Sequence, residues 1–145
     1  MNPVERPPYR VVDHAADMAF EVEAADWRGL LSAATLALSD LVRPLGRFDT
    51  WTNRRVSVKG ADAEAVLEAW LSEVIYLFAK GGFLPAIAEV ESADDTRASG
   101  ILRGGCTDGD DDPPDRLVKA VARHDLHVIP GGDGRPWRAR VVLDL

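Results

Sequence analysis

The sequence predicts an α+β fold, in which two amphipathic helices pack on a mostly antiparallel β-sheet. Three observations support this prediction: two capped segments repeat apolar residues every three to four positions, other segments alternate apolar and polar residues, and turn residues fill the gaps. The chain has 145 residues, of which 46% are hydrophobic. That size suits one core, so we expect residues 1–145 to form a single domain.

Two segments are predicted to be helices. The first follows Asp26, a good N-cap residue, and continues at helical apolar spacing until Pro44. The second follows Asp62, which is also a good N-cap, and ends at the pair Gly81 and Gly82. Each helix therefore has one apolar stripe that has to be covered by other elements.

The remaining ordered segments are predicted to be strands. Their residue ranges are 9–12, 18–24, 55–59, 87–90, 101–103, 117–129 and 137–145. The clearest pattern is in 18–24, where apolar residues alternate with Glu21 and Glu23, as expected of a strand with one buried face. The order of elements, with four strands after the second helix, favours antiparallel pairing.

Charge and cysteine content limit the possible functions. A formal net charge of −7 argues against a broad phosphate-binding surface, so any contact with RNA is expected to run through a partner protein. The single cysteine, Cys106, cannot form an internal disulfide, which favours the cytoplasm. No run of about 18 apolar residues and no signal peptide are seen, so we expect no membrane association.

A first candidate site is the segment Asp13-His14-Ala15-Ala16-Asp17, which places two carboxylates and an imidazole just before a predicted strand. Aspartates in short loops often accept hydrogen bonds from local backbone N–H groups, and this structural role is one interpretation. The other is that Asp17 offers oxygen ligands to a hard cation, with His14 as a neighbouring hydrogen-bonding group.

A second candidate is the end of the last predicted strand, where Asp144 is followed by Leu145. If the strand is held in a sheet, the side-chain carboxylate of Asp144 and the α-carboxylate of Leu145 lie close together. Close carboxylates repel unless one is protonated or a cation lies between them, so Ca²⁺ or Mg²⁺ would relieve the repulsion. The alternative is that both carboxylates are simply solvated at the surface.

Other familiar sites are not predicted. The acidic segment 108–115 does not fit an EF-hand loop, because Pro113 stands where glycine is needed and Lys119 where a glutamate is needed. Neither a nucleophile elbow nor a glycine-rich phosphate loop is present in the sequence. We therefore predict no catalytic residues, no cofactor-binding motif and no small-molecule substrate.

The segment 13–17 resembles the Asp-His-Thr-Ala-Asp signature of the archease family. Further similarities follow in the same order along the chain, in segments 34–38, 70–73, 119–124 and 140–145. The resemblance extends from about Tyr9 to Leu145. There are departures: Ala15 stands where the family usually has threonine, and Ala122 and Arg123 replace a common Thr-Tyr pair.

The resemblance implies an accessory protein, not an autonomous enzyme. Its partner would be the 3′-phosphate RNA-splicing ligase, whose guanylylation it promotes so that the ligase turns over repeatedly in tRNA splicing or RNA repair. The family's metal ligands correspond to Asp17, Asp144 and the terminal Leu145, and the implied cofactor is a divalent metal, calcium in the first place.

Two other functions remain as alternatives. The first is a metal-dependent phosphoester hydrolase in which Asp17 and Asp144 hold a cation that activates water, although the sequence offers no clear general base. The second is a chaperone-like module for other RNA-modifying enzymes, with the acidic surface as its docking face.

Overall fold

The computed structural model describes residues 8–13, 18–42, 51–106 and 118–145. The backbone of 12–13 is included in these ranges, but not the two side chains. In chain order the elements are β1 (Tyr9–Asp13), β2 (Met18–Ala24), α1 (Trp27–Val42), β3 (Thr52–Lys59), α2 (Ala63–Gly81), β4 (Phe83–Ala93), β5 (Arg97–Cys106), β6 (Ala120–Val121), the short 3₁₀-helix η1 (Arg123–Asp125), β7 (His127–Ile129) and β8 (Trp137–Asp144).

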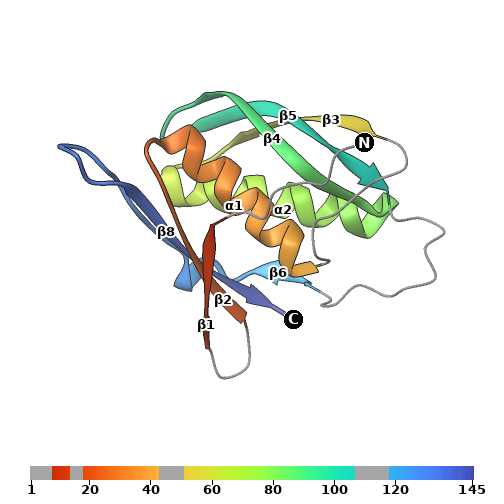
Figure 1. Ribbon diagram of the computed structural model, residues 1–145, viewed down its shortest axis with the longest axis horizontal. Helices are drawn as coiled ribbons and strands as arrows, with labels where there is room; N and C mark the ends of the chain where they lie inside the picture. Colours follow the sequence, from red (N-terminus) through yellow and green to blue (C-terminus); the bar gives the residue numbers. More distant parts are fainter. Residues whose placement is uncertain (1–7, 14–17, 43–50, 107–117) are drawn as a thin grey trace.

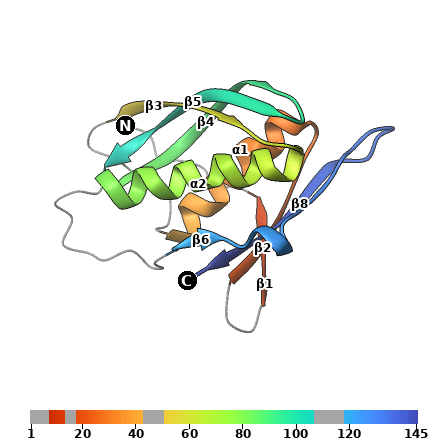
Figure 2. The same cartoon turned by 180° about the vertical axis from the view of Figure 1, so that it is seen from behind.

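The described strands form two antiparallel sheets, and the two helices lie between them (Figures 1 and 2). One sheet has the order β1-β2-β8-β6, with β7 also pairing with β8, and the other has the order β3-β5-β4. This arrangement confirms the α+β class and the antiparallel pairing. The sequence did not predict that the strands divide between two sheets, and this division covers the apolar faces of both helices.

The predicted helix starts are confirmed by their capping bonds. The Asp26 carboxylate accepts a hydrogen bond of 2.7 Å from the backbone N–H of Gly29, and the Asp62 carboxylate accepts one of 2.7 Å from Ala65. At the end of α2, Gly82 has a φ of 70°, the left-handed conformation that glycine adopts at no steric cost. These caps satisfy backbone groups that helices leave unpaired at their ends.

The core lies where the apolar stripes of the helices meet both sheets. It includes the fully buried Trp70, whose indole N–H donates a 2.8 Å hydrogen bond to the Thr35 hydroxyl. That hydroxyl in turn donates to the carbonyl of Leu31 at 2.7 Å, so two buried polar groups on α1 and α2 satisfy each other. None of the helices in the described ranges is long and apolar enough to cross a membrane.

Strands β4 and β5 are longer than the predicted ranges 87–90 and 101–103. Pro85 is tolerated inside β4 because it lies at one of two register irregularities, between Pro85 and Ile87. The other irregularity lies between Val90 and Ser92. Strand-breaking residues therefore do not end these strands, since the bulges accommodate them.

The prediction of one long strand over 117–129 is wrong. Within the described part of this range, β6 and β7 are separated by η1. The break occurs because the backbone N–H of Leu126 bonds to Arg123 at 3.3 Å, which turns the chain. Arg123 also forms ion pairs with Asp62 at 3.4 Å and Glu68 at 3.7 Å on α2, while Leu126 is buried. These contacts lie far apart in sequence and leave no local pattern.

Candidate metal centre

Strand β8 carries Asp144 at its end, between β2 on one side and β6 on the other. Leu143, just before it, pairs with Met18 of β2 and with Val121 of β6, and its side chain is fully buried. The carbonyl of Asp144 accepts a 2.8 Å hydrogen bond from the backbone N–H of Lys119. Leu143 is therefore paired on both sides, and the backbone at Asp144 is held on the side of β6.

The alternation along β8 places Asp144 on the face that points away from the helices. Val141 and Leu143 are fully buried against the helical layer, whereas Arg138, Arg140 and Asp144 occupy the opposite face. Within the described ranges no side chain forms a hydrogen bond or ion pair with the carboxylate of Asp144. Its oxygens are thus not used by the described neighbours, and oxygen is the donor that Ca²⁺ and Mg²⁺ prefer.

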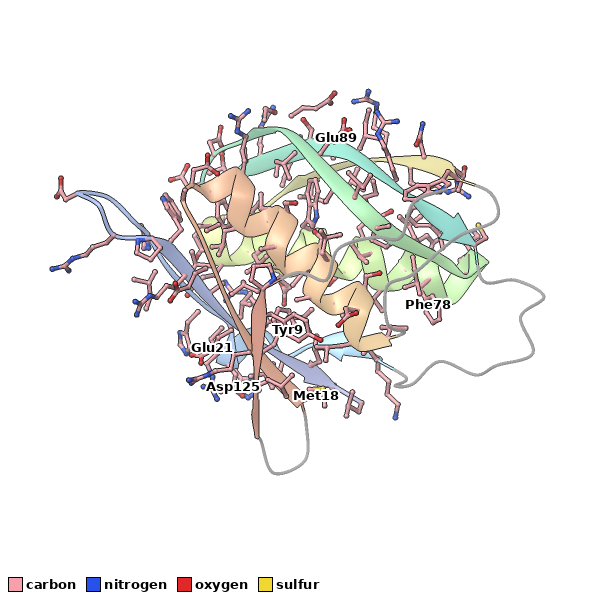
Figure 3. All side chains as sticks on the ribbon, in the orientation of Figure 1. Tyr9, Met18, Glu21, Phe78, Glu89 and Asp125 are labelled. Carbon is pink, nitrogen blue, oxygen red and sulfur yellow. The ribbon has the colours of Figure 1, made fainter. Side chains whose placement is uncertain are left out.

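The other predicted ligands are placed only in part. Asp17 and His14 lie outside the described residues, and so does the side chain of Asp13. The described residue next to Asp17 in sequence is Met18, which lies beside the end of β8 (Figure 3). Leu145 follows the last residue of β8 and is 43% exposed.

No group of three histidine, cysteine, aspartate or glutamate side chains that could hold a metal occurs within the described ranges. This finding does not bear on the predicted centre, because Asp17 lies outside those ranges and Leu145 would contribute its α-carboxylate and not a side chain. Asp144 and Leu145 are the described members of the predicted donor set, and carboxylate oxygens are the ligands that hard cations prefer. The predicted centre at the end of β8 therefore depends on residues on either side of the Met18–Leu143 pair.

A groove of about 650 Å³ lies on the outer face of this sheet, the face that also carries Asp144. It crosses β1, β2, β8 and β7, and is lined by Pro8, Tyr9, Arg10, Glu21, Val22, Glu23, His127, Ile129, Arg138, Ala139 and Arg140. Alternation along β8 puts Arg138 and Arg140 on its outer face, but the sequence does not predict a groove. Strand register brings its charged side chains together, and sequence spacing does not reveal that register.

The acidic segment 108–115 lies outside the described residues, so the structure adds nothing to the interpretation of that loop. His124 lies in η1, where its Nε2 is 3.0 Å from the carboxylate of Asp125. His127 lies on β7, with its Nδ1 3.8 Å from the carboxylate of Glu64. Each histidine faces a different acidic neighbour, so the structure does not bring the two together at one site.

Comparison with known proteins shows which family this chain resembles. Residues 9–145 match the family model described as "Archease protein family (MTH1598/TM1083)". The protein archease of Methanopyrus kandleri is 32% identical over 141 residues, covering 95% of this chain and 99% of that protein. The protein archease of Archaeoglobus fulgidus is 39% identical over 99 residues, covering 67% of this chain and 72% of that protein.

Among solved structures, the solution structure of Methanobacterium thermoautotrophicum protein 1598 has a similar fold. The TM-score is 0.71 with 24% identity, over 94% of this chain and 98% of that protein. This likeness supports the arrangement of two helices with antiparallel sheets. The match over 9–145 and the identity to the Methanopyrus protein lead to one conclusion: the chain belongs to the archease family.

Proposed function

We propose that this protein is an accessory factor that activates a 3′-phosphate RNA-splicing ligase. It promotes guanylylation of the ligase and so allows repeated turnover in cytoplasmic tRNA splicing or RNA repair. The observation that carries the proposal is the family match over residues 9–145. The net charge of −7 agrees with a protein that reaches RNA through its partner, since it disfavours direct phosphate binding over a wide surface.

The proposed working site is a divalent metal centre formed by Asp17, Asp144 and the α-carboxylate of Leu145, with calcium as the first candidate. Its support is the pairing of Met18 with Leu143. Asp17 and Asp144 are each one residue from this pair, and consecutive Cα atoms are about 3.8 Å apart. A cation held there would supply a fixed positive charge that can bind an anionic group of the partner.

The metal site is tested by calorimetric titration of the purified protein with Ca²⁺. We expect Asp144→Ala and Asp17→Ala each to weaken binding by at least about tenfold, because each change removes a carboxylate ligand. The matched control is Asp95→Ala, at an exposed aspartate in the β4–β5 turn, which should bind as the unaltered protein does. Equal affinity in Asp144→Ala and the control would remove Asp144 from the site.

The role of Leu145 is tested by extending the chain beyond it. A few added residues convert the α-carboxylate to a peptide group, so the extension should weaken Ca²⁺ binding without unfolding the protein. An extended chain that binds Ca²⁺ as tightly as the original would exclude Leu145 as a ligand.

The function is tested with the cognate ligase, GTP, a divalent metal and RNA ends bearing a 3′-phosphate. We expect no joining by this protein alone, and many joined ends per ligase molecule when it is added. A cognate ligase whose guanylylation and turnover are unchanged by the protein would refute the proposal. Phosphoester hydrolysis by the isolated protein, lost in Asp17→Ala, would favour the hydrolase alternative instead. Binding to other RNA-modifying enzymes, with no effect on the ligase, would favour the chaperone alternative.

A further inference from the structure

The outer face of the five-stranded sheet carries the groove of about 650 Å³ described above. Across one rung of the sheet, register aligns Arg10 of β1, Glu21 of β2, Arg140 of β8 and His127 of β7. Three arginines and two glutamates line the groove. In a chain of net charge −7, this concave surface is therefore locally cationic.

The three arginines have different environments. Arg10 pairs with Glu21 at 2.9 Å, and Arg138 pairs with Glu23 at 3.1 Å. Arg140 lies between these two pairs, is partly buried, and forms no ion pair or side-chain hydrogen bond within the described ranges. Its guanidinium thus has donors to offer to a carboxylate entering the groove.

Strand β7 forms one wall of the groove, with His127 opposite Arg140 and Ile129 opposite Arg138. Ile129 of β7 lines the groove and is 60% exposed. The next residue back, Val128, donates its backbone N–H to the carboxylate of Glu64 on α2 at 3.0 Å, which fixes β7 to the body of the protein. Beyond Ile129 the chain enters the hairpin that projects from the molecule (Figure 1). An apolar side chain that covers Ile129 would remove apolar surface from water on a strand that is already fixed.

The groove and the end of β8 belong to one continuous face. Arg140 and Asp144 lie on the same side of β8, four residues apart, which corresponds to about 13 Å along a strand. The small buried cluster of Ala19, Ala122 and Val142 closes the surface between them. A partner held in the groove would thus be within reach of a site at Asp144.

A protein segment suits this groove better than a nucleic acid. Glu21 and Glu23 already neutralise two of the three arginines in the groove, so one guanidinium remains. One guanidinium can pair with a single carboxylate, whereas a nucleic acid presents successive phosphates that need several cations. The exposed Ile129 adds an apolar contact that a sugar-phosphate backbone does not need. One available guanidinium beside an apolar anchor matches a carboxylate next to an apolar side chain.

We infer that this groove is the docking surface for the partner protein, and that it takes an acidic segment whose carboxylate binds Arg140 while a neighbouring apolar side chain packs on Ile129. The inference rests on the proposed function, which makes the ligase that partner. The groove then binds the ligase, and the metal centre at the end of β8 is a separate site.

The test measures the affinity of immobilised cognate ligase for the full-length protein. Arg140→Gln and Ile129→Ser remove the charge and the anchor, and each should weaken binding by about tenfold or more. The controls, Lys59→Gln and Ile87→Ser, remove a positive charge and an isoleucine at exposed residues of the other sheet and should leave affinity unchanged. Added salt should weaken binding of the unaltered protein more than that of Arg140→Gln.

The outcomes separate this inference from the proposed function. If the unaltered protein does not bind the ligase, both fail. If it binds and activates the ligase, while Arg140→Gln and Ile129→Ser bind as tightly as the controls, only the docking surface is wrong. If the protein alone binds a fluorescent RNA oligonucleotide and Arg140→Gln does not, the groove binds RNA and the inferred protein segment is wrong. Should Arg140→Gln fail to fold, the result for the exposed Ile129 decides the matter.

Discussion

Replacement of Gly100 by alanine tests whether close strand packing requires a glycine in the middle of β5. Gly100 pairs with Val56 on one side and Val90 on the other, beside the irregularity between Val90 and Ser92. A Cβ atom built on Gly100 would lie 2.2 Å from the carbonyl oxygen of Glu89 and 2.9 Å from the Cα of Val90. Both are backbone atoms, so no side-chain rotation can relieve the overlap.

The expected cost follows from these distances. Ordinary van der Waals contact with a Cβ begins at 3.4 Å, so β4 has to move away from β5 and strain the bulge. Overpacking of this kind costs about 1–3 kcal/mol of unfolding free energy. With a urea slope of about 2 kcal/mol per molar, a loss of about 2 kcal/mol lowers the unfolding midpoint by about 1 M.

The assay is urea unfolding followed by tryptophan fluorescence, with Gly81→Ala as the matched control. A Cβ at Gly81, the last residue of α2, would meet nothing within 4 Å. That replacement should leave stability unchanged or raise it by up to about 1 kcal/mol, because alanine favours a helix over glycine. If Gly100→Ala were as stable as Gly81→Ala, the steric explanation for this glycine would be refuted.

Three further changes test the packing and electrostatics of the same fold. Tyr9→Phe removes a 2.6 Å hydrogen bond to the buried carboxylate of Asp40 and should cost about 1.5–3 kcal/mol in urea unfolding; an unchanged midpoint would contradict this. Thr35→Val leaves the indole N–H of Trp70 without its acceptor and should cost about 1–3 kcal/mol, whereas in a Trp70→Phe background most of that cost should vanish. The pKa of Asp94 lies below its ordinary value, chiefly because the backbone N–H two residues later donates to its carboxylate. Its contribution to stability is thus present at neutral pH and lost as pH falls through the lowered pKa, and an NMR titration that found the ordinary pKa would contradict it.

The helices could be predicted from sequence because their signals are local. Asp26 and Asp62 act on backbone N–H groups three residues away, and Gly82 ends α2 through its own backbone conformation. The full extents of β4 and β5 could not be predicted from sequence, because Pro85 and the glycines of β5 normally indicate turns. Here they fit because both register irregularities lie in β4, and the residues that begin them, Pro85 and Val90, pair with Gly104 and Gly100 of β5.

The break at η1 and the groove around Arg140 were not predicted, because both depend on contacts between residues far apart in sequence. Arg123, at the start of η1, forms ion pairs with the N-cap of α2, Asp62, and with Glu68 on α2. Both partners are more than fifty positions earlier in the chain, so the local sequence pattern does not reveal these contacts. At the candidate site, the alternation of β8 was enough to place Asp144 on the outer face and Leu143 in the core. The role of Arg140 was not predicted, because it becomes apparent only when register sets four strands side by side.

The measurement that tests the proposed function and its site together is guanylylation of the cognate ligase with radiolabelled GTP. It compares the unaltered protein with Asp144→Asn, which keeps the shape of the side chain but removes its charge, and with the control Asp95→Asn. We predict that the unaltered protein and the control raise the amount of guanylylated ligase and that Asp144→Asn does not. Equal stimulation by all three proteins would contradict the proposal that a carboxylate metal centre at the end of β8 activates the ligase.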